Sequence, residues 1–485
     1  MSQSFYKKNY SFVCCLKVVY LIISLLVIHP NGILYAQELR PNEENVISKP
    51  FKGDLSEILE RRVVRILVPY SKTGFSFDDG EYRGLQADAI KEFEQLINEN
   101  RTKNQAPIFV AVLPVNFNQL LPMLLSGKGD IAAGLITLTP ERLAKVDFAS
   151  GRKLVVDELL VTSKDTPTLG SLEDYAGKTV YVLSGSSYLT NLTSINAQLR
   201  SSGVDEINVI EADSNLASED ILEMVNAGII DATVVDNYKA DLWAQVLPNI
   251  VVHQNIKINS GGSVGWAIRK ESPELAALLE IFISRVKKGT LLGNIFLKRH
   301  YKNTDWIKNP TNEKERKKFA ELTSIFSRYA DKYEFDYLAL AAQAFQESRF
   351  DHTSISSAGA IGIMQLLPST AADPNVDIAN IDILENNIHA GAKYMSFLRS
   401  RYFSNDDTSK QDQFAFTWAA YNAGPAKVRR LRDKAKEMGL NPNKWFHNVE
   451  YAALEVVGLE TVRYVANIYK YYIAYKLSQD LSVSK

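Results

Sequence analysis

Cysteine is nearly absent from this chain of 485 residues. The sequence contains two cysteines, Cys14 and Cys15, which are neighbours near the N-terminus. A small disulfide scaffold needs several cysteines spread along the chain, so that class of protein is excluded. The preceding "SFV" lacks the small residue that a lipid-attachment site places before its cysteine. Beyond Cys15 the chain must therefore be held together by its hydrophobic core.

Histidine and a large excess of charge are also lacking. The six histidines show no ligand spacing such as His-Glu-x-x-His, so we predict neither a metal site nor another cofactor. The formal net charge is −1, and this balance does not indicate a nucleic-acid partner.

The apolar run near the N-terminus is too short to span a bilayer. It reads "VVYLIISLLVI" over residues 18–28 and follows three lysines, as the apolar part of a signal peptide does. We predict a signal peptide over residues 1–36 with cleavage after Ala36, export, and a polar linker over residues 37–60. An uncleaved anchor is the alternative.

Strand and helix patterns then alternate over residues 61–303. Residues 62–70 read as a buried strand, "LQADAIKEFEQLINEN" as an amphipathic helix, and residues 107–115 as a second strand. Two later passages echo each other, "NQLLPMLLSGKGDIAAGLI" and "SEDILEMVNAGIIDATVV". Each combines an apolar helix, a glycine turn, an aspartate and a short strand, which predicts two α/β lobes built to a similar plan.

One helix start in this region has the chemistry of an anion site. Thr139 is a good N-cap and Pro140 suits the first helical position. Thr137 and Arg142 flank this start, and arginine can hold a carboxylate through two parallel hydrogen bonds. An amino-acid carboxylate would fit there; a solvated or interlobe salt bridge is the alternative.

The region from about residue 63 to 301 resembles the family-3 periplasmic solute-binding proteins, the receptors for polar amino acids. The resemblance rests on "YRGLQADAI", "GKGDIAAGLITLTPERLAKVDFA", "AGIIDATVVDNY" and "GGSVGWAIRKESPELAALLEIFI". It implies that Arg142 and Thr137 hold the α-carboxylate of a ligand. It also implies that Asp236 receives the α-ammonium group and that an aromatic side chain near Tyr70 covers the ligand. Leu135 stands where many relatives have a polar residue, which leaves the ligand's identity open.

From residue 304 onward the sequence predicts helices and loops, hence an all-α domain over residues 304–485. Asp336 can cap the helix "YLALAAQAFQESRF", on which Leu340, Ala344 and Glu347 fall along one side. A carboxyl group on an apolar face in the last turn of a helix is disfavoured as an anion. The pKa of Glu347 should therefore rise, which would keep a large share of it protonated at about pH 6 as a general acid. A solvated glutamate at a frayed helix end is the alternative.

Four motifs in this domain resemble the lysozyme-like lytic transglycosylases of bacterial cell walls, over about residues 319–475. They are Glu-Ser at residue 347, Gly-x-x-Gly-x-Met-Gln, Ala-Tyr-Asn-Ala-Gly, and Glu-Thr-x-x-Tyr-Val. The resemblance makes Glu347 the catalytic residue and gives the other positions roles in binding or support. These positions are Ser348, Gly362, Met364, Gln365, Tyr421, Asn422 and Glu460.

The resemblance also accounts for the second carboxylate that most glycosidases need and that these motifs do not supply. In this family Glu347 would protonate the bond between N-acetylmuramic acid and N-acetylglucosamine, and then deprotonate the muramoyl C6 hydroxyl as it attacks C1. The whole chain is therefore predicted to be multidomain, a two-lobed α/β binding-protein fold followed by an all-α lysozyme-like domain. We expect a peptidoglycan lytic transglycosylase, exported to the periplasm and peripheral to the outer membrane. Its first module would bind an amino acid or stem peptide. The alternatives are a receptor whose helical domain only binds glycan, and a muramidase that uses water.

Overall fold

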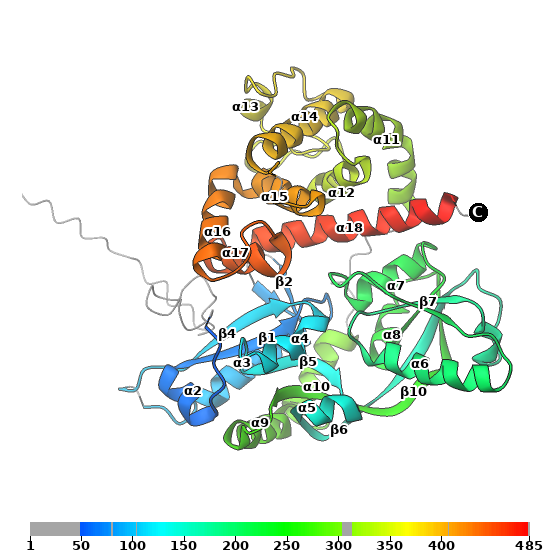
Figure 1. The fold of residues 1–485 in the computed structure, drawn as a ribbon, viewed down its shortest axis with the longest axis vertical. Coiled ribbons are helices and arrows are strands. Elements are labelled where there is room, and N and C mark those ends of the chain that lie inside the picture. The colour runs from blue at the N-terminus through cyan, green and yellow to red at the C-terminus, as the bar shows by residue number, and fades with distance from the viewer. Residues whose placement is uncertain (1–48, 79–80, 103, 303–312, 406, 484–485) are drawn as a thin grey trace, which may run out of the picture. The chain divides into compact units, whose positions relative to one another are not determined.

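The strands lie in the first part of the chain and the second part is helical, as Figure 1 shows. The computed structural model describes residues 49–78, 81–102, 104–302, 313–405 and 407–483. From residue 49 onward these residues belong to one compact unit. The predicted signal peptide and most of the predicted linker lie outside the described residues. Among the described residues, no helix is long and apolar enough to cross a membrane.

One sheet runs through both lobes of the first domain, with the strand order β4-β1-β5-β10-β6-β9-β7-β8. Its centre is the antiparallel pair β6 (Val146–Ser163) and β10 (Ile250–Arg269), which is long enough to belong to both lobes. The first lobe adds β1 (Val63–Pro69), β4 (Phe109–Val115) and β5 (Ile131–Thr137). The second lobe adds β7 (Thr179–Val182), β8 (Asn208–Glu211) and β9 (Ala232–Asp236). A separate two-stranded sheet pairs β2 (Ser76–Asp78) with β3 (Glu81–Arg83).

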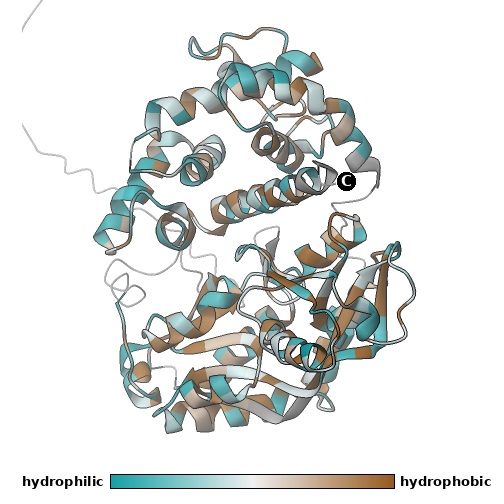
Figure 2. Cartoon of the chain, turned by 45° about the vertical axis from the view of Figure 1, so that its right-hand side comes forward, coloured by the Kyte–Doolittle hydropathy of each residue, from teal (hydrophilic) through white to brown (hydrophobic). Residues whose placement is uncertain are grey.

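Each lobe has its own hydrophobic core, and the strands are largely hydrophobic in Figure 2. The two echoing passages form α4 (Leu120–Leu125) with β5 in one lobe and α7 (Ser218–Asn226) with β9 in the other. This confirms the two-lobed plan. The other helices of the domain are α3 (Leu85–Asn98), α5 (Pro140–Lys145), α6 (Ser187–Ser201), α8 (Asn237–Trp243), α9 (Pro273–Val286) and α10 (Leu291–Leu297), with short helical turns at Phe117–Gln119, Glu173–Tyr175 and Lys298–Lys302.

The first domain begins earlier than the sequence predicted. Helix α2 (Leu55–Arg61) is capped by Asp54, and its Ile58 is fully buried in the core of the first lobe. Upstream of it, the Phe51 N–H donates to the Gly127 carbonyl at 2.8 Å. Residues 51–60, assigned to the linker from their polarity, therefore belong to the folded domain, because one buried face suffices to anchor a short polar helix.

The helical domain packs around a single core of large apolar side chains. Its catalytic-motif helices are α12 (Tyr337–Ser348), α15 (Lys410–Ala423) and α18 (Leu459–Val483). Helix α18 packs against both α12 and α15, so residues far apart in sequence meet there. The remaining helices are α11 (Glu313–Lys332), α13 (Pro368–Ala371), α14 (Leu384–Tyr402), α16 (Pro425–Glu437) and α17 (Glu450–Val456), with a short turn at Trp445–Val449.

Candidate functional site

Helix α12 presents Glu347 in its last turn, as predicted. The Asp336 side chain caps the helix by accepting from the Leu338 N–H at 2.9 Å. Leu340 and Ala344 are fully buried on the side that carries Glu347. The helix ends where Arg349 adopts the left-handed conformation, with φ of 55°. The Glu347 carboxyl group is thus held at a fixed point between the helix end and the loop that follows.

Burial raises the pKa of Glu347 to about 7, and a hydrogen bond from Tyr464 opposes this rise. The Tyr464 hydroxyl, on α18, donates to Glu347 Oε1. Among the described residues Glu347 forms no salt bridge, so no fixed cation holds it ionised. A carboxyl group in this setting can give up a proton near neutral pH and take one back.

The loop after α12 is tied to the helix end by backbone contacts. Ser348 Oγ donates to the Ile363 carbonyl at 2.9 Å. Gly362 has φ of 79°, and an added Cβ would come within 2.6 Å of Asn387 Nδ2, so only glycine fits. Gln365 Nε2 donates to the carbonyls of Ser354 and Gly362 at 3.0 and 2.9 Å. Ser348, Gly362 and Gln365 therefore shape the loop beside Glu347.

The remaining predicted residues divide between this cluster and its surroundings. The Tyr421 hydroxyl donates to the Met364 carbonyl at 2.7 Å, and Tyr421 interacts electrostatically with Glu347. The Met364 side chain is fully buried, which leaves its backbone as the part that faces Tyr421. Asn422 accepts a hydrogen bond from the Thr461 hydroxyl at 2.9 Å. Glu460 is exposed in the first turn of α18.

Two contacts in this cluster were not predicted from the sequence, although Tyr464 was counted among the polar residues that suit a sugar cleft. Tyr464 lies in the quoted Glu-Thr-x-x-Tyr-Val motif, but nothing in its spacing reveals contact with a residue 117 positions earlier. Asn387 is buried in α14, where its Oδ1 accepts from the Met364 N–H at 2.8 Å. A single asparagine near a helix start gives no signal of such a contact.

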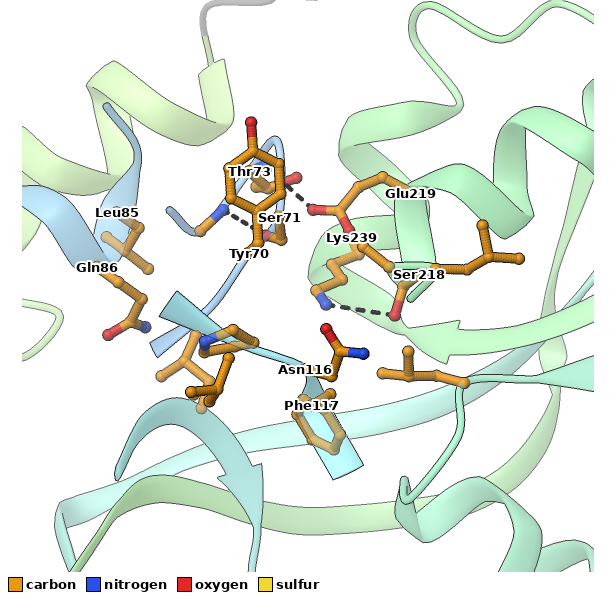
Figure 3. A pocket seen from close by; sticks show the side chains of 18 of the residues that line it. Tyr70, Ser71, Thr73, Leu85, Gln86, Asn116, Phe117, Ser218, Glu219 and Lys239 are labelled. Atoms are coloured by element: carbon orange, nitrogen blue, oxygen red, sulfur yellow. Dashed lines mark hydrogen bonds between the residues drawn. The ribbon is translucent and has the colours of Figure 1, made fainter. Parts of the chain in front are cut away.

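A second candidate site is the pocket between the two lobes of the first domain (Figure 3). The first lobe contributes Tyr70 and Gln86, and the second contributes Glu219 and Lys239. The lobes touch there, because the Thr73 N–H donates to Glu219 Oε1 at 3.1 Å. Figure 3 shows the Lys239 side chain beside Ser218, to which it donates at 3.4 Å. Polar and aromatic side chains therefore face one pocket, which suits a small polar ligand.

The residues predicted to hold the ligand are only partly assembled around this pocket. Arg142 donates to the Thr137 carbonyl at 2.7 Å and to the Gly185 carbonyl of the second lobe at 2.8 Å. It also interacts electrostatically with the buried Asp236, to which the Tyr188 hydroxyl donates at 3.1 Å. Tyr70 lines the interlobe pocket, whereas Arg142 lines an adjoining hollow.

Comparison with known proteins supports both halves of this description. The model of the bacterial extracellular solute-binding proteins, family 3, matches residues 64–298, and that of the transglycosylase SLT domain matches residues 324–443. The membrane-bound lytic murein transglycosylase F of Desulfosudis oleivorans is 29% identical over 373 residues, which cover 73% of this chain and 79% of that protein. The chain is a lytic transglycosylase with a solute-binding module.

Other relatives extend the similarity along the chain. The membrane-bound lytic murein transglycosylase F of Pseudomonas fluorescens Pf-5 is 25% identical, covering 88% of this chain and 87% of that protein. Among solved structures, an ancestral arginine-binding protein bound to arginine is 24% identical, with a TM-score of 0.41, and covers 50% of this chain and 99% of its own.

The part of this lytic transglycosylase that matches the SLT domain model contains Glu347, the loop around Gly362 and the Tyr421–Asn422 pair, but it ends before α18. The hydroxyl that contacts Glu347 therefore comes from a helix beyond the matched region.

Proposed function

We propose that this lytic transglycosylase cleaves the β-1,4 bond between N-acetylmuramic acid and N-acetylglucosamine in peptidoglycan and leaves a 1,6-anhydromuramoyl end. The observation that carries this proposal is a single half-buried carboxyl group, Glu347, with its pKa raised to about 7. In transglycosylation the residue that donates the proton later accepts one, so a single carboxyl group of this kind is enough.

In the first half of the reaction Glu347 donates its proton to the glycosidic oxygen as the bond to C1 breaks. In the second half the Glu347 carboxylate accepts the proton of the muramoyl C6 hydroxyl while that oxygen bonds to C1. No water is consumed, and Glu347 ends the cycle protonated. Because nucleophile and electrophile belong to one sugar, their proximity replaces the second carboxylate of a hydrolase.

Mass spectrometry of purified peptidoglycan digested by the chain tests this function. Transglycosylation yields a muramoyl product that is lighter by one water than the product of hydrolysis. The Glu347→Gln variant is the control, because its amide keeps the shape but cannot deliver a proton. The hydrated product alone would identify a water-using muramidase. If parent and variant both leave the glycan intact but bind it, the chain is a receptor with a glycan-binding domain.

The solute-binding module is proposed to bind an amino acid or a muropeptide stem peptide. Arg142 would meet the α-carboxylate, and Asp236 would meet the α-ammonium group, with Thr137 and Tyr70 completing the site. In support, Glu219 Oε2 is buried at the interlobe pocket and has no hydrogen-bond partner among the described residues. A polar ligand would satisfy such a group.

Calorimetric titration with amino acids and stem peptides tests this binding. Arg142→Ala should weaken binding at least about tenfold, because a bidentate pair with a carboxylate is lost. Arg200→Ala is the matched control, since Arg200 pairs with Glu206 on the exposed surface. Equal affinities of the two variants would remove Arg142 from the site.

For location, we propose export to the periplasm and peripheral attachment to the outer membrane. The apolar run at residues 18–28 supports export. Cell fractionation of the full chain checks the proposal, since release by high salt distinguishes peripheral attachment from an embedded anchor. Recovery in the cytoplasm would rule it out.

A further inference from the structure

Gln343 is an unusual residue in the core of the helical domain. It lies in α12, within a buried run from Leu338 to Phe345 whose remaining residues are all apolar. Its side chain is completely buried, yet within the described part of the chain neither Oε1 nor Nε2 has a hydrogen-bond partner at ordinary distance and angle. Buried amides normally have partners, so this one calls for an explanation.

The surroundings of Gln343 connect it to the catalytic acid. It precedes Glu347 by four residues and so lies on the same side of α12. Helix α18 packs on α12 there and brings the Tyr464 hydroxyl within reach of the Gln343 side chain. That hydroxyl already donates to Glu347 Oε1. Gln343, Tyr464 and Glu347 therefore form a row of polar groups where α12 packs against α18.

The proton in the contact between Tyr464 and Glu347 can be placed in two ways. Tyr464 can donate to Oε1, which leaves the acidic proton of Glu347 on Oε2. Alternatively, a proton on Oε1 can be donated to the Tyr464 oxygen, where it is turned away from the substrate. A phenol has one proton to donate, and its oxygen can accept as well. An amide N–H given to that oxygen occupies its acceptor side and strengthens its hydroxyl as a donor.

We propose that Gln343 is a positioning residue, which donates its amide N–H to Tyr464 and thereby keeps the acidic proton of Glu347 on the oxygen that faces the glycosidic bond. The inference rests on the proposed function of Glu347 as the acid. Gln343 acts through Tyr464 and does not touch the sugar. A leucine at this position would fill a similar volume, but it has no N–H to donate to Tyr464 and would therefore favour neither proton arrangement.

The test combines steady-state kinetics with a double-mutant cycle. Gln343→Leu should lower kcat about 10- to 100-fold, as expected when a reacting group is misplaced, and leave KM within about twofold. In the Tyr464→Phe background the same substitution should change kcat less than about twofold, because the residue through which it acts is gone. Gln346→Leu is the matched control: the same change on the same helix, at a half-buried residue outside the row.

The pH profile provides the second readout. The ionisable groups that face Glu347 are Tyr464 from α18 and Tyr421 from α15. In Gln343→Leu the protonated acid can donate to Tyr464 and is stabilised, so the alkaline limb of the profile should move to higher pH. The thermal unfolding midpoint should stay unchanged or rise, because the substitution also removes a buried amide oxygen, Gln343 Oε1, that has no partner among the described residues.

Several results would overturn the proposal. One is a Gln343→Leu enzyme with the parent kcat and pH profile. Another is a kcat loss that is equally large with and without Tyr464, or one that comes with a lowered unfolding midpoint and an unmoved pH profile, since either marks a packing role. An inactive parent enzyme would instead refute the proposed function itself.

Discussion

At the scale of the residue, the chemistry depends on how one carboxyl group is surrounded. The sequence predicted a raised Glu347 pKa from apolar neighbours on its helix and from the helix end. The structure confirms the direction and adds a hydroxyl from α18 that opposes it. This second contribution could not be predicted, because it depends on how two helices far apart in sequence pack together.

The raised pKa predicts how the rate depends on pH. The general acid must be protonated in the free enzyme, and the pKa of Glu347 is about 7. We therefore expect kcat/KM on soluble glycan fragments to be level in mildly acidic buffer and to fall about tenfold per pH unit at alkaline pH. Initial rates across a pH series measure this. A profile that stays level through alkaline pH would contradict the assignment.

Stability should depend on pH through the same group. Burial raises the pKa of Glu347 from 4.5 to about 7, so the folded state binds a proton more tightly than the unfolded state does. The resulting stability is fully present below about pH 4.5 and is lost as pH rises through about 7. Glu347→Gln cannot titrate. Its free energy of unfolding should therefore rise relative to that of the parent, by on the order of 3 kcal/mol, as the pH goes from acidic to alkaline. Calorimetric unfolding at both ends of this range checks this prediction; parallel behaviour of the two proteins would argue against a raised pKa for Glu347.

At the scale of the element, the catalytic loop is held by a helix that the motifs do not include. Asn387 in α14 donates to the carbonyls of Ile361 and Ile381 at 2.9 and 2.8 Å and accepts from the Met364 N–H. Its amide is thus fully used while buried. Helix caps such as Asp336 and Thr139 were predictable because their partners lie within three residues. The partners of Asn387 lie up to 26 residues away, so local pattern could not find them.

Asn387→Ala should therefore loosen the loop. Removing the amide leaves the buried Met364 N–H and the Ile381 carbonyl without their partners, at a cost of about 2–4 kcal/mol. We expect a lower unfolding midpoint together with a loss of activity of about tenfold or more, since Gly362 and Gln365 lie in the same loop. The neighbour Asn386 is half-buried, and its amide bonds only the exposed loop carbonyls of Ala379 and Asn380, so it serves as the control, with Asn386→Ala changing stability by less than about 1 kcal/mol. Equal effects of the two substitutions would mean that Asn387 does not hold the loop.

At the scale of the whole molecule, α18 serves both modules. Near its start it gives Tyr464 to the catalytic acid, and further along Lys470 pairs with Asp220 of the second lobe at 3.0 Å. The Lys470 ammonium group also lies 5.1 Å from the centre of the Tyr70 ring, which lines the interlobe pocket. The Tyr469 hydroxyl donates to Asp213 at 2.9 Å. One rigid helix thus touches both candidate sites, a link that the separate motifs did not predict.

This arrangement predicts that ligand binding and glycan binding are coupled. Two-lobed binding proteins close around their ligands, so a ligand that moves Tyr70 or α7 disturbs the contacts of Lys470. The coupling must be equal in both directions: a ligand that favours glycan binding must itself bind more tightly when glycan is present, typically by about 5- to 150-fold. Calorimetric titration of Glu347→Gln with stem peptides, with and without a glycan oligomer, measures the factor.

The same titration with a second substitution locates the coupling. Lys470→Met removes the ion pair with Asp220 but keeps most of the side-chain volume, so the ratio of the two affinities should fall toward one. Lys476→Met is the matched control on the same helix, because its charge has no salt bridge among the described residues. If the ratio is one already without Lys470→Met, the solute-binding module only tethers or targets the enzyme. If the ratio is large and Lys470→Met leaves it unchanged, the coupling passes through contacts other than this ion pair, and Lys470 does not link the two sites.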